Sequence, residues 1–406
     1  MIARRLCLLI AWLIALPVVA EPPIWPGDRI VFVGNTFADQ LRIHGYLETL
    51  LLQRSIGKPV SIRNLGWAGD MLTARDRPTN FPTEESTLTA HKTDVIIACF
   101  GMGESFAGAT GLDDFKKDLA DFVASHKGKK YNGRSEVRLV LISPIAYEQL
   151  GPHTPNHERR NRELAAYTLA MKETAGEAGL PFVNLNEPTA KLMADSVAPK
   201  LTGNGVNLNA YGYWCVSRTL ADALLPGAAP WRLNVDAGAG SASAEGVRVA
   251  QVRSAGNGVA FNVEELVWPS IGAPAQGNVH RDLEPMRDTL RVANLKPGVY
   301  RLDVDGEEVA VAGHDEWAFG VALDATPAHR ALREYREAIN DKNLQFVYGW
   351  KALNQVHIVG ERRKSASGRA LPGEVIEFNK LANRKDAELA KGIRLKTREW
   401  RLTLIK

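Results

Sequence analysis

The chain has 406 residues, of which 45% are hydrophobic and 24% are charged, and it carries a formal net charge of +4. This length exceeds one ordinary domain, and the apolar fraction is ample for packed cores, so two or three domains are expected. A net charge of +4 spread over 406 residues gives no reason to expect a nucleic acid or a membrane surface as partner.

The N-terminus has the pattern of a targeting segment. Arg4 and Arg5 precede an apolar run over 6–20, and Val18 and Ala20 occupy the −3 and −1 positions of a cleavage site. The run is short for a membrane span, which favours a cleaved signal peptide over a retained anchor. We therefore expect an exported protein, secreted or periplasmic, with no stable membrane span after cleavage.

The first half of the chain alternates between apolar runs of strand length and segments with helical spacing. A short proline-rich entry precedes them. The expected strands are 30–33, 60–64, 94–100, 137–143 and 180–185, and the expected helices are 37–54, 112–126, 161–178 and 209–225. Such alternation predicts an α/β domain with a five-stranded parallel sheet covered on both faces.

The pattern changes after the proline- and glycine-rich segment 226–230, which is the best candidate for a linker. Short alternating runs follow, and Asp305-Gly306 is a strong two-residue hairpin signal between two of them. Helical spacing returns at 331–349 and 378–389, and a terminal strand is expected near 400–405. The expected organisation is a signal peptide (1–20), an α/β domain (25–225), a small antiparallel β module (231–325) and a C-terminal helical region (326–406).

Two cysteines, Cys99 and Cys215, remain once the leader is removed. They are compatible with one disulfide in an oxidising compartment and equally with two small buried apolar side chains. No Cys/His spacing indicates zinc or haem, so neither a metal nor a cofactor is expected.

Four short blocks fall at the ends of expected strands or in the closing loop. Gly34-Asn35-Thr36 follows the first strand, and Asn64-Leu65-Gly66-Trp67-Ala68-Gly69-Asp70 follows the second. Gly101-Met102-Gly103-Glu104 follows the third, and Asn204-Gly205-Val206-Asn207 precedes the last helix of the domain. In order and spacing these blocks resemble those of the SGNH (GDSL-type) hydrolases over about residues 27–225. The wider sequence around them resembles a secreted subgroup from planctomycete-type bacteria.

The resemblance implies a three-layer, flavodoxin-like SGNH fold and hydrolysis of a carboxylic ester, plausibly an acetyl ester on a carbohydrate. It places Thr36 at the nucleophile position and assigns the backbone N–H of Gly69 to the oxyanion. Gly103 stands where the family has a second oxyanion donor. Asn204 and Asn207 stand in the places of the acid and the histidine base. Asn35, Asp70 and Glu104, beside these blocks, are the expected substrate contacts.

Several of these residues depart from what ester hydrolysis needs, namely a hydroxyl, a base, an orienting acid and oxyanion donors. Thr36 has a hydroxyl, but its methyl group hinders attack of that hydroxyl on an ester carbonyl. A structural role, in which Thr36 caps the next helix, accounts for the residue equally well. Glycine at 103 removes an amide donor worth about 3 kcal/mol of transition-state stabilisation. Asn207 cannot accept the hydroxyl proton, and His44, His153 and His157 are the candidate replacements for the base.

Two functions of different classes follow. The first is an ester hydrolase of small-molecule or carbohydrate esters. The second is a pseudoenzyme that keeps the cleft to bind a glycan or an ester without catalysis, and the substitutions at Gly103 and Asn207 favour it. Four aromatic residues near the predicted cleft are candidates for stacking on sugar rings: Trp67, Phe106, Tyr147 and Tyr211.

Overall fold

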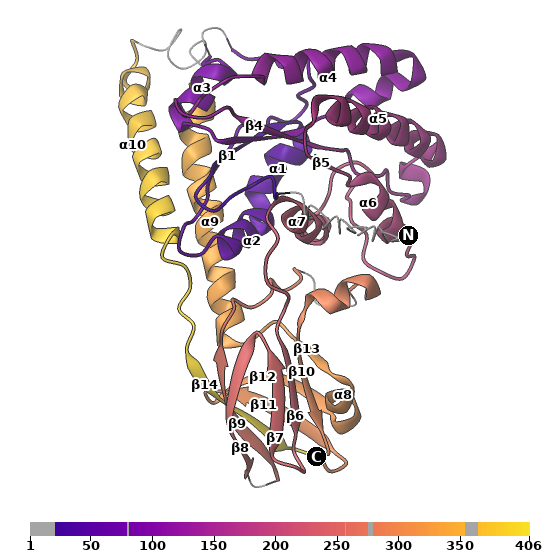
Figure 1. Cartoon of the computed structure of the whole chain (residues 1–406), viewed down its shortest axis with the longest axis vertical. Coiled ribbons are helices and arrows are strands. Elements are labelled where there is room, and N and C mark those ends of the chain that lie inside the picture. Colours follow the sequence, from indigo (N-terminus) through magenta and orange to yellow (C-terminus); the bar gives the residue numbers. More distant parts are fainter. Residues whose placement is uncertain (1–20, 79–80, 256, 275–278, 354–363) are drawn as a thin grey trace, which may run out of the picture.

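The computed structural model describes residues 21–78, 81–255, 257–274, 279–353 and 364–406. The predicted signal peptide, 1–20, lies outside the described residues. An α/β domain lies at one end of the molecule and a β module at the other, and two long helices run along the side of the first (Figure 1).

The α/β domain contains a five-stranded sheet with the order β2-β1-β3-β4-β5, in which every pairing is parallel. The strands are β1 (Arg29–Gly34), β2 (Ser61–Asn64), β3 (Val95–Cys99), β4 (Arg138–Ile142) and β5 (Phe182–Val183). All five expected strands are present, and the fifth is shorter than expected. The predicted α/β fold class is therefore confirmed.

Alternate residues of the strands enter two separate cores, one on each face of the sheet. Ile30 and Phe32 face a core formed with α1, α2 and α7, whereas Val31 and Val33 face a core formed with α3, α4 and α5. The helices and short 3-10 turns of this domain are α1 (Thr36–His44), α2 (Tyr46–Arg54), α3 (Glu84–His91), η1 (Glu104–Gly111), α4 (Leu112–His126), η2 (Gly151–His153), α5 (His157–Ala178), α6 (Asn186–Met193) and α7 (Ala210–Leu224). This two-sided burial is the reason that the strands are nearly continuous apolar runs.

One predicted helix is wrong in its bounds, because the expected helix 37–54 is two helices, α1 and α2. They are separated at Gly45, whose φ of 67° is left-handed. A Cβ on Gly45 would lie 2.2 Å from Oδ1 of Asn340, so the helix of Asn340 approaches the backbone at this point. Gly45 ends α1 as a left-handed cap, with its N–H donating to the carbonyl of Leu41, and the nearby Asn340 leaves no room for a side chain at this position.

The β module consists of two sheets with the orders β13-β10-β6-β7 and β12-β11-β14-β9-β8. Its elements are β6 (Arg232–Asp236), β7 (Ser241–Glu245), β8 (Val247–Ala255), β9 (Gly258–Glu265), η3 (Arg281–Met286), β10 (Asp288–Ala293), β11 (Val299–Val304), β12 (Glu307–Gly313), α8 (His314–Phe319), β13 (Val321–Leu323) and β14 (Thr397–Leu404). Asp305 and Gly306 both have positive φ and join β11 to β12, which confirms the hairpin. The pairings are antiparallel, as expected, with one exception, the parallel pair of β6 and β10.

Two long helices leave the β module, cover the α/β domain and return. They are α9 (Pro327–Lys351) and α10 (Ala366–Leu389), which pack on each other (Figure 1). The chain then enters β14, which lies between β11 and β9 in the middle of its sheet. The last residues of the predicted C-terminal helical region therefore form a central strand of the β module.

A buried ion pair attaches α9 to the α/β domain. The ammonium group of Lys342, which is fully buried, lies 2.5 Å from Oε1 of Glu48 and donates to the carbonyl of Ile62. Asn343 donates to the other oxygen of Glu48. Asp386 of α10 accepts from Arg63 of β2 at 2.6 Å. Both long helices are therefore fixed to the β2 edge of the sheet by charge as well as by apolar packing.

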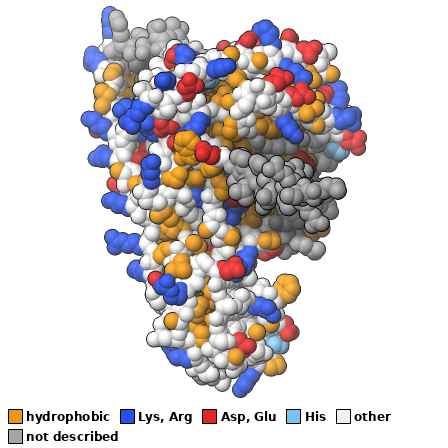
Figure 2. Space-filling model, in the orientation of Figure 1, with side chains coloured by type: hydrophobic (Ala, Val, Ile, Leu, Met, Phe, Trp, Pro, Cys, Tyr) orange, Lys and Arg blue, Asp and Glu red, His pale blue; other side chains and the backbone are white. Residues whose placement is uncertain are grey.

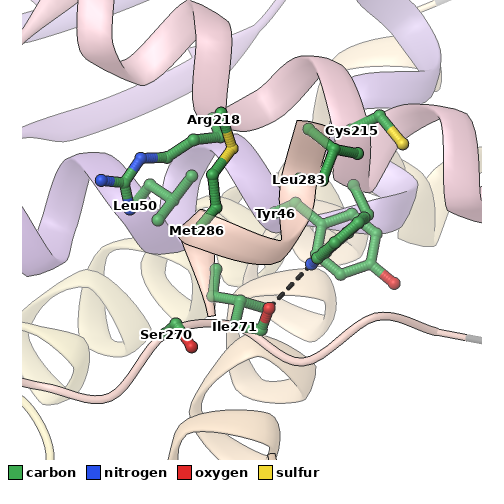
Figure 3. Close-up of a pocket in the computed structure, with 9 residues that line it drawn as sticks. Tyr46, Leu50, Cys215, Arg218, Ser270, Ile271, Leu283 and Met286 are labelled. Carbon is green, nitrogen blue, oxygen red and sulfur yellow. Dashed lines mark hydrogen bonds between the residues drawn. The ribbon is translucent and has the colours of Figure 1, made fainter. Parts of the chain in front are cut away.

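The segment before η3 joins the two halves on the other side. Trp214 of α7 donates from its indole Nε1 to the carbonyl of Ile271 at 2.7 Å, the dashed line in Figure 3. Tyr46, Leu50 and Met286 surround this bond. Gln53 of α2 donates to the carbonyls of Trp268 and Pro269. The segment before η3 is therefore anchored on the α/β domain.

Cys99 and Cys215 are free and buried, so the alternative of two small apolar side chains holds for them.

Lys and Arg side chains line the α10 edge of the molecule in Figure 2, where Arg369, Lys380 and Arg384 are exposed. Within the described ranges, no helix combines the length and the apolar character needed to cross a membrane.

We predict that Glu265 of β9 makes the protein less stable as the pH rises. Its carboxylate is 5% exposed and neither oxygen has a hydrogen-bond partner among the described residues. Burial raises the pKa of Glu265 from the ordinary 4.5 to about 7. The folded state thus holds this proton more tightly, so its stabilising effect is complete below pH 4.5 and is lost as the pH rises to about 7. The loss of this proton lowers the free energy of unfolding by about 3 kcal/mol at pH 8 and by less than about 1 kcal/mol at pH 5.

Glu265→Gln should therefore flatten the pH dependence of the free energy of unfolding, measured by urea titration at pH 5 and pH 8. The matched control is Glu264→Gln, because Glu264 is exposed and forms an ion pair with Arg248. An unchanged difference between the two pH values in Glu265→Gln would contradict the prediction.

Candidate active site at the carboxyl edge of the sheet

A pocket of about 260 Å³ lies at the carboxyl ends of β1, β3 and β4. Its lining combines residues from all four blocks: Asn35, Thr36, Phe37, Gly69, Asp70, Cys99, Phe100, Met102, Gly103, Phe106, Ser143, Pro144, Ile145, Val206 and Asn207. This is the edge at which open parallel sheets bind ligands. Of the eight predicted site residues, Glu104 and Asn204 are not part of the lining.

Thr36 is placed by the end of β1. Gly34 has a φ of 134°, and a Cβ there would lie 2.2 Å from the carbonyl oxygen of Cys99. Only glycine permits this approach of β1 to β3. Asn35 follows as the N-cap of α1, and its side-chain oxygen accepts the N–H of Phe37 at 3.0 Å. Asn35 thus has the capping role, and Thr36 is the first helical residue, with its side chain on the pocket.

Gly69 comes beside Thr36 because the loop after β2 remains paired with the end of β1. The N–H of Trp67 donates to the carbonyl of Gly34 at 2.9 Å. The N–H of Gly69 then donates to Oγ1 of Thr36 at 3.3 Å. A long bond of this kind is readily exchanged for a carbonyl oxygen of a ligand. The Gly69 N–H and the Thr36 hydroxyl therefore lie side by side in the pocket wall.

Asp70 lines the pocket, but both of its oxygens are held by one arginine. Arg77 donates to them at 2.9 and 2.5 Å, and its guanidinium stacks on the ring of Trp67 at 4.5 Å. Bidentate pairs of this geometry fix a carboxylate in one orientation. Because Arg77 lies in a loop, no sequence pattern predicts its ion pair with Asp70.

Gly103 lines the pocket, and the side chain of Met71 fills the space beside it. A Cβ on Gly103 would lie 2.9 Å from Cγ of Met71, a flexible side chain. The neighbouring Glu104 is turned away: its two oxygens accept the N–H groups of Leu72 and Gly101 at 2.9 and 2.8 Å. Burial raises the pKa of Glu104. Glu104 therefore ties two loops of the pocket wall together instead of facing the cavity.

Asn207 lies in the lining of the pocket. Its side chain is exposed, and no hydrogen bond of that side chain occurs within the described part of the chain. Asn204 does not face the pocket, because its side-chain oxygen accepts the N–H groups of Val206 and Asn207 at 3.1 and 2.8 Å. It thereby shapes the turn that carries Asn207.

The candidate replacement histidines are not in this pocket. His44 stacks on Tyr213 at the far end of α1, and Nδ1 of His157 is bonded to Gln149. His153 belongs to η2 and is likewise absent from the lining. No histidine among the described residues lines the pocket, so none of these three candidates is placed to replace the base.

Of the four aromatic candidates, only Phe106 lines the pocket. It is 63% exposed, and the guanidinium of Arg160 lies 4.0 Å from the centre of its ring. Arg160 is itself buried and donates to the carbonyl and hydroxyl oxygens of Ser105. The ring therefore lies at the mouth of the pocket, with one face against the anchored guanidinium of Arg160. Ser143, Pro144 and Ile145 complete the wall. Ser143 is the last residue of the predicted strand 137–143 and the other two follow it, so this strand end could have identified them.

No group of three or more His, Cys, Asp or Glu side chains that could hold a metal ion occurs among the described residues. Titratable groups of the lining are limited to Asp70 and Cys99, and burial raises the pKa of the Cys99 thiol.

The fold is similar to that of a gut microbial diltiazem-metabolizing enzyme, with a TM-score of 0.70 and 17% sequence identity over 95% of this chain and 99% of that one. The acetylxylan esterase Axe2 from Geobacillus stearothermophilus aligns with a TM-score of 0.38 and 18% identity over 49% of this chain and 94% of its own. No family model and no curated protein sequence matches the chain. The first similarity extends over the α/β domain, the β module and the long helices. At 17% identity it concerns the fold alone.

We predict that Gly34→Ala destabilises the protein by more than about 2 kcal/mol, because the new methyl group would collide with the Cys99 backbone. Gly69→Ala is the matched control. Gly69 has a positive φ, as Gly34 does, but no atom lies within 4 Å of a Cβ added there. That variant should lose only about 1 kcal/mol of backbone strain. Chemical denaturation of both proteins measures the difference, and equal losses would show that close packing at Gly34 is unimportant.

Proposed function

We propose that the chain is an exported protein that binds a small carboxylic ester, such as an acylated sugar, in the Thr36 pocket without efficient hydrolysis. The observation that carries this proposal is the placement of Asn207 on the pocket wall where the fold family has its base. An amide cannot take up the proton of the Thr36 hydroxyl. Loss of a positioned base typically costs a factor of about 10² to 10⁴ in rate.

The remaining titratable groups of the lining do not supply a base. Both oxygens of Asp70 accept hydrogen bonds from Arg77, and the buried thiol of Cys99 is neutral because its pKa is raised. The vacant second donor position at Gly103 removes further stabilisation of an oxyanion. These side chains therefore provide neither the base nor the second oxyanion donor that ester hydrolysis needs.

Binding is better supported than turnover. The N–H of Gly69 is available for an ester carbonyl, and apolar side chains such as Phe37, Met102 and Ile145 provide walls for a small acyl group. Phe106 lies at the mouth, where a sugar ring can stack on it. A pocket of about 260 Å³ suits an acyl group with part of the attached alcohol.

The proposal predicts turnover of an activated acetate ester and of acetylated oligosaccharides that is equal in the purified protein and in Thr36→Ala. It also predicts that the protein binds an acetylated oligosaccharide more tightly than the deacetylated one, and that Phe106→Ala weakens this binding. Calorimetry and a chromogenic assay provide the two measurements. Turnover that disappears in Thr36→Ala would support the ester hydrolase instead.

A gain-of-function variant serves as the positive control for this assay. Thr36→Ser, Gly103→Asn, Asn204→Asp and Asn207→His together restore the family's residues, and the amide at 103 needs only a movement of the Met71 side chain. Hydrolysis should rise at least about 100-fold, because the triad and its second donor are rebuilt. The same variant with Thr36→Ala in place of Thr36→Ser should stay at the background rate. No gain in the rebuilt protein would mean that this pocket is not an ester site.

Export is supported by Arg4, Arg5 and the apolar run over 6–20. Expression in a bacterium with a periplasm should yield a mature protein that starts at Glu21, as determined by N-terminal sequencing of the periplasmic fraction. Recovery of the full-length chain in the membrane fraction would support an anchor instead.

A further inference from the structure

A second and larger cavity lies between the α/β domain and the β module, and its volume is about 540 Å³. It is bounded by Tyr46 of α2, the segment before η3, the start of β10 and one face of α9. Its described lining shares no residue with that of the Thr36 pocket. The volume falls within the range of small-molecule sites in proteins.

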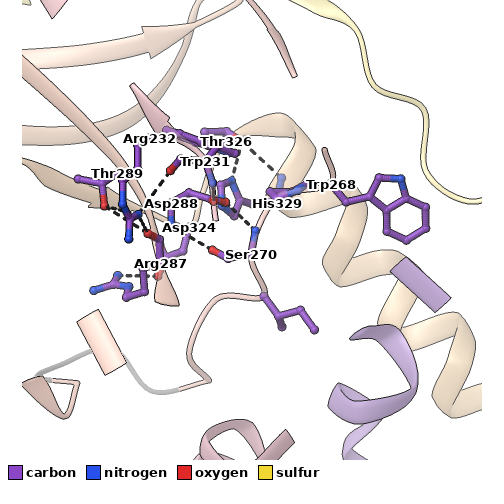
Figure 4. Close-up of polar contacts among 12 residues, drawn as sticks. Trp231, Arg232, Trp268, Ser270, Arg287, Asp288, Thr289, Asp324, Thr326 and His329 are labelled. Atoms are coloured by element: carbon purple, nitrogen blue, oxygen red, sulfur yellow. Dashed lines mark hydrogen bonds and ion pairs between the residues drawn. The ribbon is translucent and has the colours of Figure 1, made fainter. Parts of the chain in front are cut away.

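Positive charge dominates the walls of this cavity. Arg287, Arg333 and Arg336 line it, and Asp324 is the one carboxylate among the described lining residues. Figure 4 shows Arg287 beside Asp324, with a distance of 3.2 Å from Nη2 to Oδ2. Glu284 lies 3.5 Å from the other terminal nitrogen of Arg287. The charge of Arg287 is thus balanced, and the excess comes from α9.

Arg333 and Arg336 are one helical turn apart, on the face of α9 that borders the cavity. Arg333 is exposed and has no hydrogen bond or ion pair with any described residue. Arg336 has neutral partners: it donates to the carbonyl of His44 at 2.8 Å and stacks on the ring of Tyr46 at 4.6 Å. Two guanidinium groups without a carboxylate partner therefore face the same concave space.

His329 also borders the cavity, but its ring nitrogens are already occupied. Nδ1 is bonded to Oγ1 of Thr326 at 2.7 Å and Nε2 to the carboxylate of Asp288 at 3.1 Å (Figure 4). Thr326 is fully buried and serves as the N-cap of α9. This hydroxyl–imidazole–carboxylate chain therefore fixes the start of α9 and offers no reactive group to the cavity.

We propose that this cavity binds a small anionic molecule, with its carboxylate, sulfate or phosphate group held between Arg333 and Arg336. Planar guanidinium groups donate paired hydrogen bonds to such oxyanions and retain their charge at every physiological pH. Arg333 supplies an unpaired donor fork, and Arg336 is already oriented by Tyr46 and the His44 carbonyl. The site is independent of the ester-binding proposal.

The test is isothermal calorimetry of the mature protein with sodium sulfate, sodium phosphate and sodium citrate, each at the same total ionic strength. Saturable binding at one site per chain is expected for at least one probe. Arg333→Ala should weaken that binding about tenfold or more, because a charge-assisted hydrogen bond is lost. The unfolding temperature should change little, because Arg333 is exposed and unpaired.

The matched control is Arg330→Ala, which removes the same charge from the same helix outside the cavity, where Arg330 pairs with Glu307. Its affinity should equal that of the unmodified protein. Equal weakening by both variants would indicate a general charge effect and overturn the proposal, as would the absence of saturable binding with every probe. The tightest of the three probes identifies the anionic group. Thr36→Ala should leave all of these affinities unchanged, so failure here is distinct from failure of the ester-binding proposal.

Discussion

The contact between Gly34 and the carbonyl of Cys99 is the constraint on which the candidate site depends. It brings the end of β1 against the end of β3 more closely than any side chain at 34 would permit. Asn35 can then cap α1, and Thr36 begins that helix at the carboxyl edge of the sheet. The loop from β2 follows the same strand end through the Trp67–Gly34 hydrogen bond. The position of the pocket is thus determined mainly by backbone contacts at the ends of β1, β2 and β3.

A second constraint fixes the long helices to this domain. Lys342 is fully buried, so its positive charge needs partners inside the protein. The Glu48 carboxylate and the carbonyl of Ile62 provide them. Replacement of one partner would leave a buried charge without compensation, whereas apolar packing alone would tolerate sliding along the helix axis. The ion pair therefore sets the register of α9 on the α/β domain. That register also determines which α9 side chains border the large cavity near the β module.

The sequence predicts the parallel sheet well, because its strands are apolar runs buried on both faces and separated by segments with helical spacing. It also places the four blocks at one edge, and six of the eight predicted site residues line one pocket. The helix break at Gly45 has a local cause, a left-handed glycine cap, which apolar spacing alone does not reveal. The other failures have tertiary causes, and the pairing of Asp70 depends on a loop arginine, Arg77. The central position of β14 and the parallel pair β6–β10 depend on pairings between segments far apart in the chain. Local periodicity carries no information about these.

The differences between this pocket and a hydrolase site follow a physical pattern. Every difference from the residues that the sequence resemblance implies concerns a side chain: the methyl group of Thr36, the absent amide at Gly103 and the two amides at Asn204 and Asn207. The features that remain are backbone features, namely the Gly34 turn and the Gly69 N–H. Proton transfer needs side chains of suitable pKa, whereas recognition of an ester carbonyl needs only a donor and a shaped wall. Asn204 illustrates the separation, because an amide oxygen can accept the N–H groups of Val206 and Asn207 as a carboxylate would. Asn204 therefore shapes the turn that carries Asn207 without a carboxylate, and the ester-binding proposal needs no more of this turn than that.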